Sequence, residues 1–140
     1  MQKAVLTLLI TGFLGPLAEA CPQLQGTFRC RTSEAFDLTI TEGQADADYP
    51  SYTMSDPTGV RSFIVDGQTR ELAFKQGKGE YRAHCEDNVL LVEVRSPEGE
   101  VFHDRYYIER AALVRVRRGK DQASSLSCAP TQGTWRMYPH

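Results

Sequence analysis

The sequence has no long apolar run beyond residues 4–14, and this absence excludes a membrane-spanning helix from the rest of the chain. Its 140 residues carry a formal net charge of only −2, which gives no general attraction to nucleic acid or to an anionic membrane. Histidine is scarce, at three residues, and no two cysteines have the C-x-x-C spacing of redox-active pairs. We therefore expect neither a metal centre nor a thiol–disulfide active site.

The sequence also lacks a recognisable set of catalytic side chains. His84 adjoins Cys85 and His103 adjoins Asp104, but neighbouring residues of a strand point to opposite faces of a sheet. No other spacing brings a nucleophile to a base, or one carboxylate to another. We expect a protein that is not an enzyme and that needs no cofactor.

The first twenty residues have the pattern of a secretory signal peptide. Lys3 precedes the apolar run, and Ala18 and Ala20 place small residues two apart directly before Cys21. We expect residues 1–20 to be cleaved and residues 21–140 to form one secreted or periplasmic domain. A cysteine after the cleavage site is also where bacterial lipoproteins are acylated. Glu19 fits that signal badly, so we expect no lipid on Cys21.

Alternation of apolar and polar residues dominates from Gly26 to Arg118, and a period of two indicates strands. No stretch after Pro22 shows the 3.6-residue apolar stripe of a helix. Turn-forming residues separate the runs: Asp56-Pro57-Thr58-Gly59, Asp66-Gly67 and Gly77-Lys78-Gly79. The sequence predicts an all-β fold, an antiparallel up-and-down meander barrel of eight to nine strands with a loop-like C-terminal tail.

The residues expected to point into this barrel are mostly bulky rings. They are Phe28, Phe36, Tyr52, Phe74, Tyr81, Phe102 and Tyr106. Because an eight-stranded barrel has room for little more than side chains or one small molecule, we expect a mostly packed interior with at most a small pocket at one mouth. Asp104 is the exception among the inward positions. It is either a polar anchor inside a pocket, or it pairs with Tyr52, Tyr81 or an arginine, or a bulge turns it outward.

The strongest expected surface feature is a patch of four arginines, Arg105, Arg115, Arg117 and Arg118. Alternation predicts Ala112, Val114 and Val116 inside and Arg115 and Arg117 outside, with Arg105 beside them on the preceding strand. Such a patch suits an acidic glycan, a phosphate or a negatively charged partner protein. The alternative is a solvated barrel wall on which acids such as Glu93 and Glu109 neutralise the arginines from strand to strand.

Four cysteines in an exported chain predict two disulfides, for which three pairings exist. Strand direction favours one of them, because cysteines must lie within about 7 Å of each other, measured between Cα atoms, to be joined. Counting reversals from the first strand places Cys21 and Cys85 at one end of the barrel and Cys30 and Cys128 at the other. We therefore expect the pairs Cys21–Cys85 and Cys30–Cys128.

The segment from Leu24 to Phe28 resembles the opening strand of lipocalin-type (calycin) barrels, with phenylalanine in place of the usual tryptophan; the opening also looks like small exported bacterial proteins. The lipocalin resemblance implies a binding barrel for a small apolar or amphipathic ligand, and an arginine, Arg115 or Arg117, against the Phe28 ring. The C-terminal helix of that family is not evident here. On this hypothesis the ligand cavity is lined by Tyr52, Phe74 and Tyr106, with Asp104 as its polar anchor.

A second resemblance is to C-type lysozyme inhibitors of the bacterial envelope. It rests on Phe28-Arg29-Cys30, on Gly77-Lys78-Gly79-Glu80-Tyr81 and on Cys128. This resemblance implies a protein-binding module whose loop, from Gly77 to Tyr81, enters the cleft of a lysozyme. Lys78 stands where that family has a serine-like residue, and the second inhibitory loop is not evident. On this alternative hypothesis the partner contacts Lys78 and Tyr81.

Overall fold

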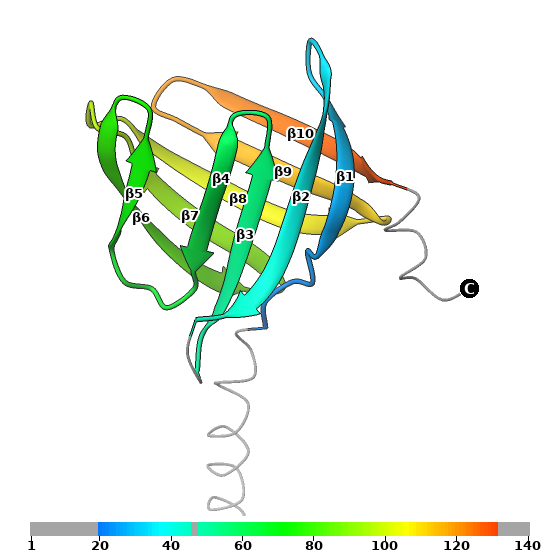
Figure 1. Ribbon diagram of the computed structural model, residues 1–140, viewed down its shortest axis with the longest axis horizontal. Coiled ribbons are helices and arrows are strands. Elements are labelled where there is room, and N and C mark those ends of the chain that lie inside the picture. Colours follow the sequence, from blue (N-terminus) through cyan, green and yellow to red (C-terminus); the bar gives the residue numbers. More distant parts are fainter. Residues whose placement is uncertain (1–19, 46–47, 132–140) are drawn as a thin grey trace, which may run out of the picture.

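The computed structural model describes residues 20–45 and 48–131, which fold into an antiparallel barrel of ten strands (Figure 1). Residues 1–19 of the expected signal peptide and residues 132–140 of the tail lie outside this range. The strands are β1 (Gly26–Arg31), β2 (Ala35–Gln44), β3 (Pro50–Asp56), β4 (Gly59–Ile64), β5 (Arg70–Phe74), β6 (Gly77–Glu86), β7 (Val89–Arg95), β8 (Val101–Glu109), β9 (Ala112–Arg118) and β10 (Ala123–Pro130). The predicted all-β meander is confirmed.

The sheet order is β4-β3-β2-β1-β10-β9-β8-β7-β6-β5, so most neighbours in sequence are neighbours in space. The strand count differs from the prediction because part of the expected loop-like tail, Ala123–Pro130, is a strand. Its serines have the composition of a loop, yet Leu126 and Cys128 are buried on alternate positions. This strand pairs with both β9 and β1 and so joins the last third of the chain to its beginning.

The barrel is closed between β4 and β5 by side chains rather than by a ladder of backbone hydrogen bonds. Phe63 of β4 packs edge-on against Tyr81 of β6, with ring centroids 5.1 Å apart. The Tyr81 hydroxyl also accepts a 2.9 Å hydrogen bond from the backbone N–H of Ile64. Asp66-Gly67, a predicted hairpin turn, instead lies in the connection across this seam, where Gly67 N–H donates to the carbonyl of Ala83. The reason is that β4 and β5 pair with β3 and β6, not with each other.

One end of the barrel is covered by the segment that precedes β1. Leu24 is fully buried, and the carboxylate of Glu42 accepts hydrogen bonds from the backbone N–H groups of Leu24 and Gln25, at 2.6 and 2.9 Å. The Tyr52 hydroxyl donates to the carbonyl of Pro22 at 2.6 Å. These contacts satisfy polar groups that would be costly to bury alone. They hold the segment that precedes β1 across this end of the barrel, which we call the floor.

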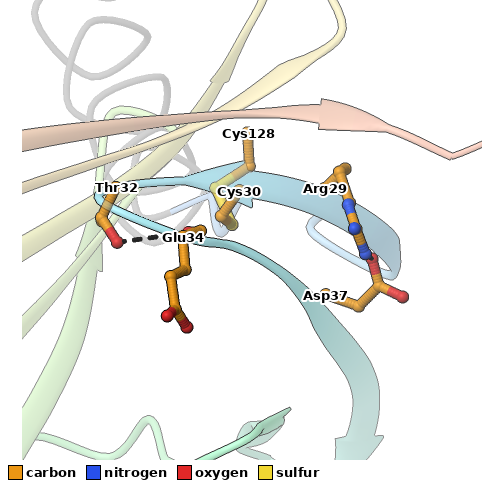
Figure 2. Close-up of a disulfide and its surroundings, with 6 residues drawn as sticks. All are labelled: Arg29, Cys30, Thr32, Glu34, Asp37 and Cys128. Atoms are coloured by element: carbon orange, nitrogen blue, oxygen red, sulfur yellow. Dashed lines mark hydrogen bonds and ion pairs between the residues drawn. A yellow bond between two sulfur atoms is a disulfide. The ribbon is translucent and has the colours of Figure 1, made fainter.

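Both disulfides have the pairing that strand direction favours. Cys21 is joined to Cys85, which ties the floor segment to β6. Cys30 is joined to Cys128, with Cα atoms 4.2 Å apart. Figure 2 shows that these two residues lie opposite each other on neighbouring strands, because β1 and β10 pair in register there. The prediction placed Cys128 in a tail after the last strand, so the pairing was correct although the location of Cys128 was not.

All four cysteines are therefore oxidised, which indicates folding in an oxidising compartment outside the cytoplasm. Among residues 20–45 and 48–131 there is no helix whose length and hydropathy suit a bilayer crossing.

Candidate functional site

The candidate site is at the barrel mouth opposite the floor, where β9 turns two arginines inward. Arg115 lies opposite Tyr106 of β8 and Leu126 of β10, and Arg117 lies opposite Asp104. Since paired residues of adjacent strands share a face, both arginines point into the barrel. The prediction of an outer patch made of Arg105, Arg115, Arg117 and Arg118 is therefore wrong for Arg115 and Arg117.

The prediction took Ala112, Val114 and Val116 as the inward row of β9, whereas the inward row is the one that contains Leu113. Val114 is buried on the outer face, opposite Tyr107, and is not part of the hydrophobic core, whereas Leu113 on the inner face is fully buried in it. Arginine is tolerated at the next two inward positions because they approach the open mouth and because β8 supplies a carboxylate. The sequence did indicate that Asp104 points inward. Because a buried carboxylate needs a partner, this position was the signal for an inward arginine on a neighbouring strand.

Asp104 and Arg117 form a two-bond ion pair inside the mouth. The guanidinium Nε and Nη2 of Arg117 donate to the two carboxylate oxygens of Asp104, each at 2.8 Å. The Asp104 side chain is only 2% exposed, and the hydrogen bond from Arg117 raises the pKa of that guanidinium. Arg117 also lies over the ring of Phe102, 5.4 Å from its centroid, whereas the lipocalin resemblance implies Phe28. Of the readings open for Asp104, the pair with an arginine is the one observed.

Arg115 differs from Arg117 in forming no ion pair with a carboxylate of the described residues. Its Nε is buried and has no hydrogen-bond partner in the described part of the chain. The neighbouring Tyr106 hydroxyl donates to Asp104 at 3.5 Å. Burial, with a smaller contribution from the Asp104 charge, raises the pKa of Tyr106 to about 12 although nearby arginines oppose the shift. Arg115 therefore presents a charged donor beside a neutral phenol.

Tyr106 and Arg115, with Asp56 and Gly59 of the β3–β4 turn, line a cavity of about 40 Å³. Gly59 and Arg61 are exposed at its rim. Its lower wall is apolar and buried, made by Leu38, Met54, Phe63 and Leu126. The cavity volume is close to that of a single water molecule, so the side chains fill most of the space at this end of the interior.

Of the four residues predicted to form one ligand cavity, Asp104 and Tyr106 come together, but Tyr52 and Phe74 do not join them. Tyr106 is at this mouth, but Tyr52 is buried near the floor, where burial and the Glu42 charge raise the pKa of its hydroxyl. Phe74 lies close to Gly79 at the end of β5. Alternation predicts the face on which each ring lies but not its height in the barrel, and here the heights differ.

The predicted partner-binding loop is also absent from the described residues. Gly77–Tyr81 is the first half of β6, because the chain reverses one step earlier, at Lys75 and Gln76. Tyr81 is 4% exposed and its hydroxyl is bonded across the seam, so it cannot reach a partner. Lys78 is exposed, and its Nζ lies 3.6 Å from Oε1 of Glu71.

Two members of the predicted arginine patch are on the outer wall: Arg105 lies opposite Leu91 and Val116, and Arg118 lies opposite His103. Across the described ranges, no group of three His, Cys, Asp or Glu side chains is arranged to hold a metal ion. The mouth therefore gains neither an outer arginine nor a metal-binding cluster.

Comparison with known proteins shows the fold alone. No family model and no curated protein sequence matches this chain. Among solved structures, it is similar to fatty-acid-binding protein 1 of Echinococcus granulosus, with a TM-score of 0.60, 10% identity, 77% of this chain covered and 97% of that one. It is also similar to a mutant of the fluorescent protein UnaG, with a TM-score of 0.61, 13% identity and coverages of 78% and 96%. At these identities the likeness to both structures is one of fold.

Proposed function

We propose that this protein is an exported, non-enzymatic binding barrel that accepts the acidic head of a small amphipathic ligand at its mouth. The observation that carries the proposal is the buried Arg115 Nε without a partner. A buried donor left unpaired is costly, and a hydrogen bond from a charged donor to a ligand oxygen recovers that cost. A carboxylate suits a guanidinium best, because two oxygens can meet two N–H groups.

The charge balance at the mouth supports an anion. Three arginines, Arg61, Arg115 and Arg117, act on Tyr106 through their charges. Asp104 neutralises only Arg117, and Asp56 is held by hydrogen bonds from the backbone and hydroxyl of Thr58. Counting three positive and two negative groups leaves one excess positive charge. A monoanionic head group would balance it.

The size of the cavity limits what enters. Sites that enclose a drug-sized molecule measure about 300–1,000 Å³, far above the 40 Å³ found here. The ligand head alone fits, with adjustment of Met54, whose unbranched side chain changes shape at low cost. The fatty-acid-binding protein that shares this fold supports a small amphipathic ligand, but the cavity beside Arg115 is too small to enclose a long acyl chain.

Export is part of the proposal. Two disulfides and the signal-like pattern of residues 1–20 support a secreted or periplasmic protein. Mass measurement of protein recovered from its source would test this, because cleavage before Cys21 predicts a chain beginning there with no lipid attached.

The binding proposal is tested by titrating octanoate into the protein in a calorimeter. We expect saturable 1:1 binding that weakens at least about tenfold in Arg115→Gln, because a charged hydrogen bond contributes about 1.5–3 kcal/mol. Arg105→Gln, which removes an arginine from the outer wall, is the matched control and should change the affinity by less than about twofold. Equal affinity in wild type and Arg115→Gln, or an equal loss in both variants, would contradict the proposal.

A further inference from the structure

We propose a second, separate binding site on the outer wall of the barrel, for a phosphate monoester with a compact organic body. We call it the outer basic hollow and define it by Leu91, His103, Arg105 and Arg118. The hollow has a volume of about 340 Å³ and lies over β6 to β9. Its basic side chains alternate along β8 and β9 with the inward side chains of the mouth, so they lie on the opposite face of the sheet.

Strand register sets the positions of the four residues. His103 lies directly opposite Arg118 of β9, and Arg105 follows two residues later on the same face of β8. Leu91 of β7 lies directly opposite Arg105. Side chains of directly paired residues are about 5 Å apart at Cβ and diagonal ones about 7–8 Å, so the two guanidinium groups and the imidazole can contact one small group.

Glu93 also lines this hollow, opposite His103, but its carboxylate pairs with Arg82, so the charges of Arg105 and Arg118 have no acidic partner among the described residues. On β6 and β7 the basic side chains have acidic partners. Arg82 donates to Glu93 at 2.7 Å, and His84 Nε2 is 3.6 Å from Glu86 Oε2. On β8 and β9, Arg105 and Arg118 form no ion pair with any residue of the described chain.

The next strand does not supply the missing charge either. The residues of β10 on this outer face include Ser125, which lies opposite Val116, and none of them is acidic. Two cations placed this close on one face repel each other unless an anion lies between them.

The chemistry of the hollow selects the ligand class. A phosphate monoester carries close to two negative charges at neutral pH, which matches the two unpaired arginines, and it has three oxygens for guanidinium donors. The volume is at the lower end of small-molecule sites and fits one ring beside the phosphate. Leu91, with Val116 on the far side of Arg105, offers that ring an apolar contact.

The experiment is a titration of the isotope-labelled protein with phenyl phosphate, followed by the backbone amide resonances. We expect saturable shifts centred on β8 and β9 around His103 and Arg105. Affinity should fall at least about tenfold in Arg105→Gln and in Arg118→Gln, since each removes a charged hydrogen bond. Phenyl sulfate and benzoate, each with a single negative charge, should bind at least about fivefold more weakly.

Arg31→Gln is the matched control, because Arg31 is an exposed arginine at the end of β1, away from β8 and β9. It should change the affinity by less than about twofold, which separates a local site from the general effect of net charge. No saturable shift on the outer wall, or equal losses in Arg31→Gln and Arg105→Gln, would overturn the inference. Shifts confined to the mouth and removed by Arg115→Gln would also overturn it, and would leave the mouth proposal intact.

Discussion

At the scale of single residues, Asp104 and Arg117 stabilise the barrel only as a pair. Asp104 is 2% exposed and Arg117 is 31% exposed, so removing the arginine leaves a carboxylate with little access to water. Breaking a buried pair costs about 3–5 kcal/mol, and the partial exposure of Arg117 reduces that figure here. Replacing both partners by apolar residues avoids the unpaired charge.

We therefore expect Asp104→Leu and Arg117→Leu each to lower the free energy of unfolding by about 2–4 kcal/mol, and the double variant to lose less than the sum of the two. Urea unfolding of the four proteins measures this double-mutant cycle. Additive losses would show that the two side chains act independently, against the geometry described.

The Tyr106 hydroxyl gives a prediction in alkaline solution. Its pKa is raised to about 12 in the folded protein, from about 10 for an exposed tyrosine. The folded state therefore keeps a proton that the unfolded state loses, and the stability contributed by the neutral phenol is complete below pH 10 and is lost between about pH 10 and 12. A difference of about two units between the folded and unfolded pKa corresponds to a loss of unfolding free energy on the order of 2–3 kcal/mol.

Urea unfolding between pH 9 and 12 measures this effect, with absorbance at 295 nm reporting ionised tyrosine. Tyr106→Phe removes the titrating group and should show a shallower decline of stability with pH. An identical decline in wild type and variant would assign it to other groups.

At the scale of elements, β6 is closely packed against both β5 and β7 at Gly79. A Cβ on this residue would clash with the carbonyl oxygen of Arg95 on β7 and would lie 2.6 Å from the Phe74 ring. A clash with backbone cannot be relieved by rotating a side chain, so Gly79→Ala should lower the free energy of unfolding by at least about 2 kcal/mol.

Gly43→Ala is the matched control, because the nearest atom to its added methyl is the hydroxyl of Ser51, at 3.1 Å, which can turn away. We expect it to cost less than about 1 kcal/mol. Thermal unfolding of the two variants compares them, and a similar change in Tm would mean that β6 can shift away from β7.

The sequence predicts these elements unevenly, for physical reasons. Strands with one apolar row, such as β2, are predictable because burial selects one face. β9 has Leu113 on one face and Val114 and Val116 on the other, so its pattern permits either orientation, and the tertiary pairing of Arg117 with Asp104 decides. β10 shows only Leu126 and Cys128 against serines, a signal too weak to distinguish a strand from a tail.

At the scale of the whole molecule, the two disulfides join segments far apart in the chain. Their sequence separations are 64 and 98 residues, and the chain-entropy estimate for closing such loops is about 4–5 kcal/mol each. The estimates differ by only a few tenths of a kcal/mol because loop entropy grows with the logarithm of length.

Replacing both cysteines of either pair by alanine should therefore lower the free energy of unfolding by about 3–5 kcal/mol, with similar losses for Cys21/Cys85 and Cys30/Cys128. Urea unfolding of the oxidised and reduced wild type provides the reference. A pair whose removal leaves the urea midpoint unchanged would not restrain the unfolded chain as described.

The fold of the whole molecule was predictable because alternation repeats over nearly a hundred residues, and errors in single strands do not change it. The site was not, because it depends on the height of each inward residue and on the orientation of one strand. The sequence identified Asp104 as an exceptional inward residue, and in the structure Asp104 lies at the mouth, paired with Arg117. Arg115, on which the proposed function rests, was placed on the wrong side.

The central claim is that the guanidinium of Arg115 binds the acidic head of a ligand inside the mouth. The most direct measurement is the Nε–Hε resonance of Arg115 in the labelled protein during an octanoate titration. We predict that this resonance shifts and saturates with the same affinity that calorimetry gives. Saturable octanoate binding that leaves the Arg115 resonance unmoved would contradict the account.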